Sequence, residues 1–289
     1  MPSKSAPPWR SLPDQPSSDG ARASWAETLD LASAAWRPET EALIERLRLR
    51  PGASILDAGC GTATVTAWLA DRVGRSGSTV GLDIDFGALE WAAWALQQQP
   101  GDRRIDLWHG DLLALPFPDD TFDAAWCSSV LGYVADPRRA LSELVRVVRP
   151  SGKVVAVSGD AARHTFLPIA PDLERRLHEV RQRAAAGGAW GEPIDLHLGR
   201  RLYPLARGLA VAKVQALAIV WERTAPLSET EQRYLARTTD WLIDPEHRHW
   251  VGDDWQECRR LFDPESGESI LSGPDLHVLQ TVSAVVITV

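Results

Sequence analysis

The sequence predicts an α/β protein with a Rossmann-like, seven-stranded, mostly parallel sheet and helical lid insertions. Between Ser54 and Ser158, short runs of branched apolar residues alternate with longer amphipathic segments, which is typical of strands and helices in a parallel sheet. A glycine turn, Gly59 and Gly61, separates the first of these strands from the first helix. The chain of 289 residues, 44% of them hydrophobic, is long enough to bury such a core.

The N-terminal residues precede the sheet and are expected to lie over it. Residues 1–23 are rich in proline and serine, so we expect a disordered tail there. Residues 24–50 carry apolar side chains at helical spacing, interrupted by Pro38. This pattern predicts two short lid helices between Ser24 and Arg48.

Residues 51–160 are expected to hold five strands with three helices between them. A turn formed by Pro150, Ser151 and Gly152 marks the chain reversal before the fifth strand. Asp85 directly precedes the second helix and is expected to cap it. The predicted strands are Ser54–Asp57, Thr79–Asp83, Ile105–Gly110, Ala124–Ser128 and Val154–Ser158, and the predicted helices are Thr64–Val73, Phe86–Gln98 and Arg138–Val148.

Residues 161–289 are expected to complete the sheet with two further strands, Val211–Trp221 and Val278–Val289. The segments 161–196 and 225–274 are predicted to be helical insertions that form a lid. Ser228 and Glu231 have the spacing of a capping box. The predicted helices are Pro171–Ala186, His197–Ala210, Ser228–Leu242 and Glu246–Phe262.

The composition argues against several classes of function. The 39 acidic and 31 basic residues give a net charge of −8, which repels nucleic acid. We therefore expect no nucleic acid as a partner. No apolar run approaches the roughly 20 residues that a membrane span needs, so we expect no membrane as a partner either. Three dispersed cysteines show no disulfide or zinc pattern, which is typical of a reducing cytoplasm.

Metal ligands are not expected either. His247 and His249 are the histidines that come nearest to a ligand pattern. On a helix, side chains two positions apart point about 200° apart, so these two cannot easily share one ion.

The glycine turn belongs to the segment LDAGCGTAT, residues 56–64. Glycine lets a ligand approach the backbone, and the helix that follows presents its first N–H groups to an anionic part of that ligand. A glycine turn of this kind could also bind a nicotinamide dinucleotide. The dinucleotide fingerprint G-x-G-x-x-G, however, requires a third glycine where this sequence has Thr64, which makes that ligand less favoured.

Two acidic residues follow at the ends of the next two strands. Asp83 lies in GLDID, residues 81–85, where a carboxylate can accept both ribose hydroxyls of an adenosine. Asp111 lies in GDLLALPFPDDTFD, residues 110–123, where an adenine amino group would donate to it. These positions favour an adenosyl ligand.

Together with RPSGKV at residues 149–154, these motifs arrive in an order that resembles the class I S-adenosylmethionine-dependent methyltransferases. Within that family the sequence is similar to the ubiquinone/menaquinone-type branch of small-molecule enzymes. The resemblance covers residues 51–158 and implies that S-adenosylmethionine is the cofactor and that residues 51–160 form the cofactor-binding core.

The resemblance also implies roles for single residues. The matching positions are Asp57, Gly59, Gly61 and Thr62 at the methionine portion, Asp83 and Ile84 at the ribose and adenine, Asp111 and Leu112 at the adenine edge, and Ser128 beside the approaching acceptor. One departure is Ala63, where the family often has glycine.

Two residues are candidates for acting on the methyl acceptor. Tyr133 follows the fourth strand and His164 the fifth, at the edge where open α/β sheets bind ligands. A neutral histidine could remove the acceptor proton, but a hydrogen-bonded loop residue is the favoured interpretation of His164, because positioning alone suffices for an acceptor that is already nucleophilic. The 13 tryptophans favour an aromatic or isoprenoid acceptor, or else they fill the core.

The sequence therefore predicts an S-adenosylmethionine-dependent methyltransferase that acts on oxygen, nitrogen or carbon of a small, apolar or aromatic molecule. Residues 126–129, WCSS, lack the D/N-P-P-Y motif of methyltransferases that act on amino groups of nucleic acid or glutamine. A nicotinamide-dependent oxidoreductase and a non-catalytic S-adenosylmethionine-binding protein stay open as alternatives. We expect a cytoplasmic enzyme of small-molecule biosynthesis and leave a homodimer open.

Overall fold

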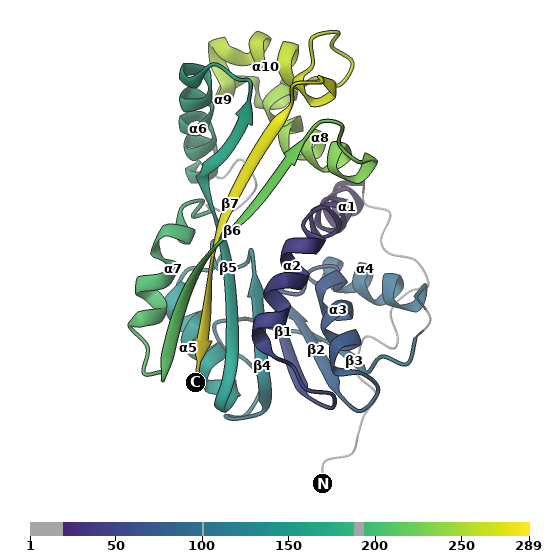
Figure 1. Cartoon of the computed structure of the whole chain (residues 1–289), viewed down its shortest axis with the longest axis vertical. Helices are drawn as coiled ribbons and strands as arrows, with labels where there is room; N and C mark the ends of the chain where they lie inside the picture. The colour runs from purple at the N-terminus through teal and green to yellow at the C-terminus, as the bar shows by residue number, and fades with distance from the viewer. Residues whose placement is uncertain (1–19, 100, 188–193) are drawn as a thin grey trace.

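A seven-stranded sheet runs through the molecule in the computed structural model, which describes residues 20–99, 101–187 and 194–289 (Figure 1). The strand order is β3-β2-β1-β4-β5-β7-β6; β1 to β5 pair in parallel, and β7 pairs antiparallel with β5 and β6. The predicted fold class is confirmed. The strands are β1 (Ser54–Ala58), β2 (Ser78–Asp83), β3 (Ile105–His109), β4 (Phe122–Ser128), β5 (Val148–Leu167), β6 (Lys213–Thr224) and β7 (His277–Thr288).

Helices cover both faces of this sheet, because side chains point alternately to its two sides. Along β4, Ala124 and Trp126 pack with apolar side chains of α2 and α3, whereas Ala125 and Cys127 pack with those of α5 and α7. The helices beside the parallel strands are α2 (Arg37–Ile44), α3 (Thr64–Val73), α4 (Phe86–Gln97), α5 (Pro137–Val147) and α7 (Leu198–Arg207).

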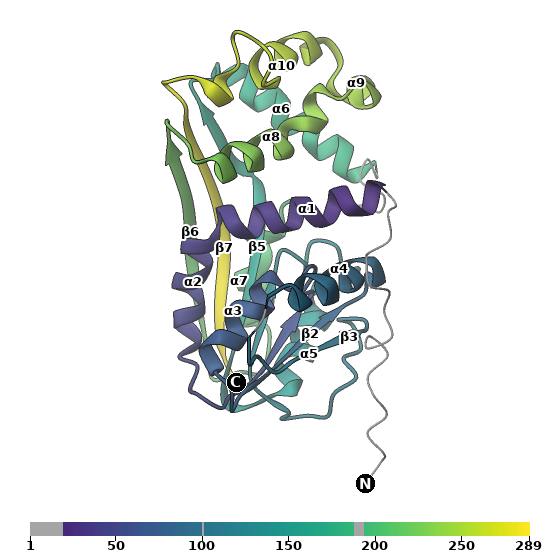
Figure 2. The same ribbon diagram turned by 90° about the vertical axis from the view of Figure 1, so that its right-hand side faces the viewer.

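Strands β5, β6 and β7 continue beyond this core and support a second group of helices (Figure 1). Apolar side chains of these helices pack with Phe166 of β5, Trp221 of β6 and Val278 of β7; we call this group the lid cluster. Helix α1 lies between the lid cluster and the core, against α8 on one side and α3 and α4 on the other (Figure 2). The helices are α1 (Gly20–Ala35), α6 (Pro171–Ala186), α8 (Glu229–Ile243), α9 (Arg248–Val251) and α10 (Trp255–Phe262).

Short 3-10 segments join several of these elements. They are η2 (Glu45–Leu47), η3 (Pro245–His247), η4 (Gly252–Asp254) and η5 (Ile270–Ser272).

Strand β5 is longer than predicted. The prediction ended the strand at Ser158, because glycine and aspartate, which follow it, are poor strand residues. In the structure the pairing with β7 shifts its register between Gly159 and His164 and then continues to Leu167. Such a shift is a bulge, which lets a strand pass through residues that would otherwise end it. The start of the predicted helical insertion is therefore strand.

Two helix boundaries also differ from the prediction. Helix α1 begins at Gly20, so residues 20–23 are helical rather than part of the tail, and residues 1–19 lie outside the described residues. The single helix predicted for Glu246–Phe262 is wrong, because Gly252 takes a φ of +68° and separates α9 from α10. The capping box at Ser228 and Glu231 is confirmed.

In the part of the chain that the structure describes, no helix combines the length and the apolar character that crossing a membrane requires.

Candidate active site

The loop after β1 folds across the end of β2. The backbone N–H groups of Gly59 and Cys60 both donate to the carbonyl of Leu82, at 2.7 and 3.0 Å. Gly59 has a φ of +77°, and a Cβ on it would lie 2.1 Å from Cγ2 of Val130. Gly61 has a φ of +52°. Both conformations favour glycine, so this loop exposes backbone that side chains elsewhere would cover.

Ala63 takes the left-handed conformation that glycine would supply at the same place. Its φ is +61°, and it is the residue that directly precedes α3. The departure from the family pattern therefore places a non-glycine residue in a left-handed conformation, which side chains with a Cβ rarely adopt.

Asp83 at the end of β2 holds this loop in place. Its Oδ2 accepts a hydrogen bond from the Gly61 N–H at 2.8 Å, and its Oδ1 accepts one from the Asp85 N–H at 2.9 Å. Burial raises the pKa of the Asp83 carboxyl, and these backbone donors oppose that shift. Asp85 caps α4 by accepting from the N–H groups of Gly87 and Ala88, as predicted.

Asp57 lies beneath the loop and is almost completely buried. Thr66 donates its hydroxyl to Oδ2 of Asp57 at 2.6 Å. Burial raises the pKa of Asp57 to about 7; the hydrogen bond from Thr66 lowers it, and the nearby charge of Asp83 raises it further. Asp57 therefore titrates in the neutral range rather than as an ordinary surface acid.

The side of the loop away from α1 is open to solvent. Ile84 is 67% exposed beyond the end of β2, an unusual position for a large apolar side chain. After β3, Asp111 is exposed and accepts from the Leu113 N–H at 2.8 Å, whereas Leu112 is buried in the core. Of this predicted pair, the carboxylate of Asp111 is the side chain that reaches solvent.

Helix α1 is attached to the loop through Asp30, a residue that the sequence analysis missed. Thr62 and Thr64 both donate their hydroxyls to Oδ1 of Asp30, at 2.6 and 2.8 Å. The Trp91 indole N–H of α4 donates to Oδ2 at 3.0 Å. Thr62, predicted to contact the methionine portion, thus has its hydroxyl directed to Asp30. An isolated aspartate in an amphipathic helix carries no motif that would identify this role.

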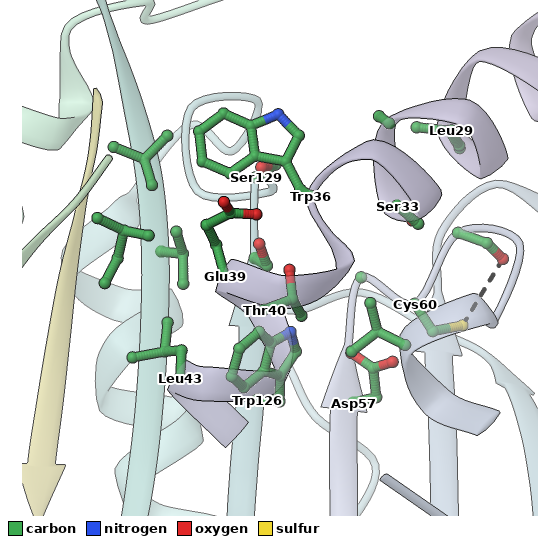
Figure 3. Close-up of a pocket in the computed structure, with 18 of the residues that line it drawn as sticks. Leu29, Ser33, Trp36, Glu39, Thr40, Leu43, Asp57, Cys60, Trp126 and Ser129 are labelled. Carbon is green, nitrogen blue, oxygen red and sulfur yellow. Dashed lines mark hydrogen bonds between the residues drawn. The ribbon is translucent and has the colours of Figure 1, made fainter. Parts of the chain in front are cut away.

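A cavity of about 290 Å³ lies between the loop, helices α1 and α2, and strands β5 to β7. In Figure 3 the rings of Trp36 and Trp126 stand at its two ends, with Glu39 and Thr40 between them. Asp57, Gly59, Gly61 and Thr62 line it on the loop side. Its apolar lining is Leu29, Ala32, Trp36, Leu43, Val65, Trp126, Val157, Ile219 and Val282, and its further polar lining is Ser33, Glu39, Thr40, Ser128, Ser129, Tyr234 and Gln280.

The cavity is thus bounded by residues that are far apart in the sequence. Ser128, one of the predicted positions, lines it at the end of β4. Glu39, Tyr234 and Gln280 were not singled out from the sequence, because they lie in α2, α8 and β7, outside the motifs.

Tyr133 lies in a second cavity, of about 250 Å³, and is 54% exposed. The two cavities share Ser129, Gln280 and Val282 in their linings, so they adjoin. His164 pairs through its backbone with Gln280, but its side chain lies outside what the structure describes. The structure therefore brings Tyr133 beside the first cavity rather than into it.

The three cysteines are free and buried. Burial is the main cause that raises the pKa of each thiol, to about 12 for Cys258, which keeps the sulfur atoms protonated. Within the described ranges, no cluster of three or more histidine, cysteine and acidic side chains is arranged to hold a metal ion.

Comparison with known proteins identifies the core. Residues 56–156 match the family described as "Methyltransferase domain". The demethylmenaquinone methyltransferase of Lysinibacillus sphaericus is 40% identical over 122 residues, which are 42% of this chain and 50% of the relative. That of Bacillus cereus is 39% identical over 126 residues, 43% of this chain and 50% of the relative. The chain spans about half the length of the curated relatives it matches.

Solved structures share the fold at low sequence identity. The YcgJ protein from Bacillus subtilis aligns with a TM-score of 0.54 and 17% identity, over 87% of this chain and 98% of that one. The geranyl diphosphate C-methyltransferase from Streptomyces coelicolor aligns with a TM-score of 0.54 and 13% identity, over 88% and 76%. Residues 56–156 thus match a methyltransferase domain, and the resemblance to methyltransferases of the menaquinone type is confirmed over this core.

Proposed function

We propose that the protein transfers the methyl group of S-adenosylmethionine to a small, apolar or aromatic molecule. The observation that carries the proposal is the position of the mainly apolar cavity, directly beside the loop that Asp83 holds across the strand ends. A methyl acceptor bound there is within reach of a cofactor on the loop. Macromolecular acceptors fit a cavity of about 290 Å³ poorly.

The residues of the loop fit the cofactor. A carboxylate has about four lone-pair sites, and the backbone N–H groups of Gly61 and Asp85 occupy two of those of Asp83, with the Ile84 backbone also close to it. The acceptor capacity that is left suits the ribose hydroxyls. Ile84 offers an exposed apolar face for adenine, and Asp57 and Thr62 line the cavity near the cationic methionine portion.

When bound, the cofactor supplies an electrophilic methyl group on a sulfonium. The protein's own contribution is to orient the reactants and exclude water. Helices α1 and α2 close the cavity, and Leu29 lies over Gly61, where its Cδ1 would be 3.2 Å from a Cβ on that glycine. His164 and Tyr133 stay candidates for acting on the acceptor, His164 by accepting its proton.

The nicotinamide alternative is disfavoured by charge. A dinucleotide places its pyrophosphate at the start of the helix after the glycine loop. Here the carboxylate of Asp30 lies at that place, bonded to Thr62 and Thr64, and it would repel the phosphates. S-adenosylmethionine has one carboxylate against a sulfonium and an ammonium group, so its net positive charge is attracted instead.

Calorimetric titration with S-adenosylhomocysteine, with NADH in parallel, tests the cofactor. We expect binding of the former and none of the latter. Transfer of labelled methyl groups to a panel of naphthols, phenols and amines then tests catalysis. A demethylated naphthoquinol is the first acceptor to try, given the names of the curated relatives. Binding of the cofactor without any product would favour the non-catalytic alternative.

Localisation and assembly are proposed separately. We propose a cytoplasmic enzyme of small-molecule biosynthesis, supported by three buried free thiols, which suit a reducing compartment. A homodimer is compatible with β6, an edge strand on which Val220 is 46% exposed. Sedimentation velocity distinguishes a dimer from a monomer.

A further inference from the structure

At the lid end of the cavity, three side chains from separate elements form one hydrogen-bonded chain. The indole N–H of Trp36, between α1 and α2, donates to the hydroxyl oxygen of Tyr234 on α8 at 3.0 Å. That hydroxyl donates to Oε1 of Gln280 on β7 at 2.8 Å. All three side chains line the cavity beside the cofactor loop.

The hydrogen-bonding capacity of Tyr234 is not exhausted by these contacts. A phenol oxygen has one hydrogen to donate and two lone pairs that accept. The hydrogen is directed to Gln280, and the Trp36 indole uses one lone pair. Among the described residues these are the two hydrogen bonds of the hydroxyl, so one lone pair is left to accept.

The hydroxyl is held in a fixed orientation. The ring of Tyr234 packs edge-on against Trp221, with ring centroids 5.5 Å apart, and Trp221 stacks on Trp36 at 5.9 Å. Tyr234 is only 8% exposed. Burial raises its pKa, so the group stays a neutral phenol.

A second hydrogen-bond acceptor lies in the same wall. Oε1 of Glu39 accepts from the Arg223 guanidinium at 2.9 Å, which holds the carboxylate in place at the cavity. A carboxylate accepts and does not donate. Beside the amide of Gln280 and the hydroxyls of Thr40 and Ser129, the cavity wall therefore includes two fixed acceptors, the oxygen of Tyr234 and the carboxylate of Glu39. Such an acceptor is complemented by an O–H or N–H group of the ligand.

We propose that Tyr234 positions the methyl acceptor by accepting a hydrogen bond from it, so that the acceptor is an apolar ring bearing a hydroxyl or amino group. The inference rests on the proposed function and narrows its substrate class. Tyr234 is a positioning residue in this role.

Three one-ring ligands test the proposal on the full-length protein loaded with S-adenosylhomocysteine. Phenol can donate a hydrogen bond, anisole can only accept one, and benzene can do neither. Titrations followed by the Trp36 indole N–H signal in NMR spectra report binding at this end of the cavity, with a Trp36→Phe variant to assign the signal.

The wild-type protein is expected to bind phenol about three- to tenfold more tightly than benzene or anisole, the range of one net hydrogen bond. Tyr234→Phe keeps the packed ring and removes the oxygen, so this preference should vanish while benzene binding stays unchanged. Tyr203→Phe, at a 42% exposed tyrosine on α7, is the matched control and should keep the preference.

A second variant does not depend on the folding of the first. Gln280→Met releases the Tyr234 hydrogen toward the cavity, so anisole should gain affinity relative to phenol. A wild-type protein without preference for phenol, or a Tyr234→Phe variant that retains it, would overturn the proposal. Calorimetry with S-adenosylhomocysteine on the same samples separates the outcomes: absent binding in wild type contradicts the proposed function, whereas intact binding without phenol preference contradicts the role of Tyr234 alone.

Discussion

Asp57 shows how one buried side chain connects the stability of the core to the chemistry of the site. It is 2% exposed and lines the cavity, and its ionised form has one described hydrogen bond, from Thr66. Its pKa of about 7 means that the folded protein resists its ionisation. A cationic ligand near the loop would favour the ionised form, so this acid can respond to occupancy of the site.

The raised pKa of Asp57 predicts a pH-dependent stability of the ligand-free protein. The pKa is about 3.9 in the unfolded chain and about 7 in the fold. Below pH 4 the Asp57 carboxyl is protonated in both the folded and the unfolded chain. Between about pH 4 and pH 7 it ionises only in the unfolded chain. Raising the pH through this range therefore lowers the free energy of unfolding by up to ~4 kcal/mol.

Asp57→Asn keeps an acceptor for Thr66 but does not titrate. Chemical denaturation at pH 5 and pH 8 should therefore show the variant gaining stability relative to wild type at the higher pH. Parallel changes in both proteins would show that Asp57 ionises normally.

Asp83 should control cofactor affinity. Each oxygen of the Asp83 carboxylate now accepts a hydrogen bond from one backbone N–H group. In Asp83→Asn one of these oxygens is replaced by an NH₂ group, which cannot accept. The variant also loses the charge that we propose holds the ribose hydroxyls, so the affinity for S-adenosylhomocysteine should fall by about 10- to 100-fold. Asp106→Asn, at an exposed position on the neighbouring β3, should leave it unchanged in the same calorimetric titration. If the two variants bound S-adenosylhomocysteine with equal affinity, the proposed contact between Asp83 and the cofactor would be contradicted.

The sequence predicts one half of the site well and the other half poorly, for a physical reason. Gly59, Gly61 and Asp83 lie in a local strand–loop–helix unit, whose conformation needs particular residues at fixed spacing. Asp30 and Tyr234 come from segments whose packing is set by long-range contacts, where many polar residues would fit an amphipathic pattern. The geometry of the loop side of the cavity is therefore visible in the sequence, and that of the side formed by α1, α2 and α8 is not.

At the scale of elements, α1 is attached both to the lid cluster and to the loop after β1. Near its C-terminal end, the carbonyl of Ala35 accepts from the buried Trp221 indole at 2.9 Å. Farther back, Asp30 accepts three hydrogen bonds from the loop and α4. Release of Asp30 would free the helix over the cofactor loop while its attachment to the lid cluster remained.

Asp30→Ala should loosen α1 selectively. The loss of charge-assisted hydrogen bonds costs about 2 kcal/mol locally, which corresponds to roughly 30-fold faster amide exchange over Gly20–Ala35. Exchange in α8 should change little. Asp30→Asn, which keeps one acceptor oxygen, is expected to be intermediate in the same mass-spectrometric measurement. Unaltered exchange in both variants would contradict an attachment through Asp30.

Arg223 connects three elements through two carboxylates. It contacts Glu39 of α2 at 2.9 Å and Glu231 of α8 at 2.5 Å, and it lies over the ring of Trp221. These charged side chains are 16–20% exposed, so removing the cation leaves two poorly solvated negative charges.

Arg223→Met should lower the free energy of unfolding by about 2 kcal/mol, the buried-pair cost reduced for partial solvation. Methionine preserves the apolar contact with Trp221. Adding Glu39→Gln and Glu231→Gln should restore most of the loss, because the repelling charges are gone. A triple variant as unstable as the single one would point to packing rather than charge. Urea denaturation of the three proteins measures this.

Two element boundaries show why the apolar pattern of the sequence alone does not predict where helices and strands end. The apolar periodicity of Glu246–Phe262 continues through Gly252, and the sequence does not reveal that this glycine takes a left-handed φ. In β5 the opposite occurs, because pairing with β7 carries the strand past Gly159. In both cases tertiary contacts decide a question that local propensity leaves open.

At the scale of the whole molecule, two groups of apolar side chains are joined by continuous strands. The core contains Leu141 and Leu144 of α5, and the lid cluster contains Leu173 and Val180 of α6. Strands β5, β6 and β7 supply side chains to both. Because the same hydrogen-bonded strands stabilise both groups, neither is expected to unfold alone.

This continuity predicts one unfolding transition that ligand binding moves as a unit. At a concentration 100 times its Kd, S-adenosylhomocysteine adds about 2.7 kcal/mol, which raises the Tm by roughly 4–5 °C for a chain of this size. Amide exchange measured during heating should show α5 and α6 losing protection at the same temperature, with and without ligand. The ligand contacts the core, so a rise confined to α5 would mean that the lid cluster folds independently. In that case the acceptor side of the cavity would open without unfolding the cofactor loop.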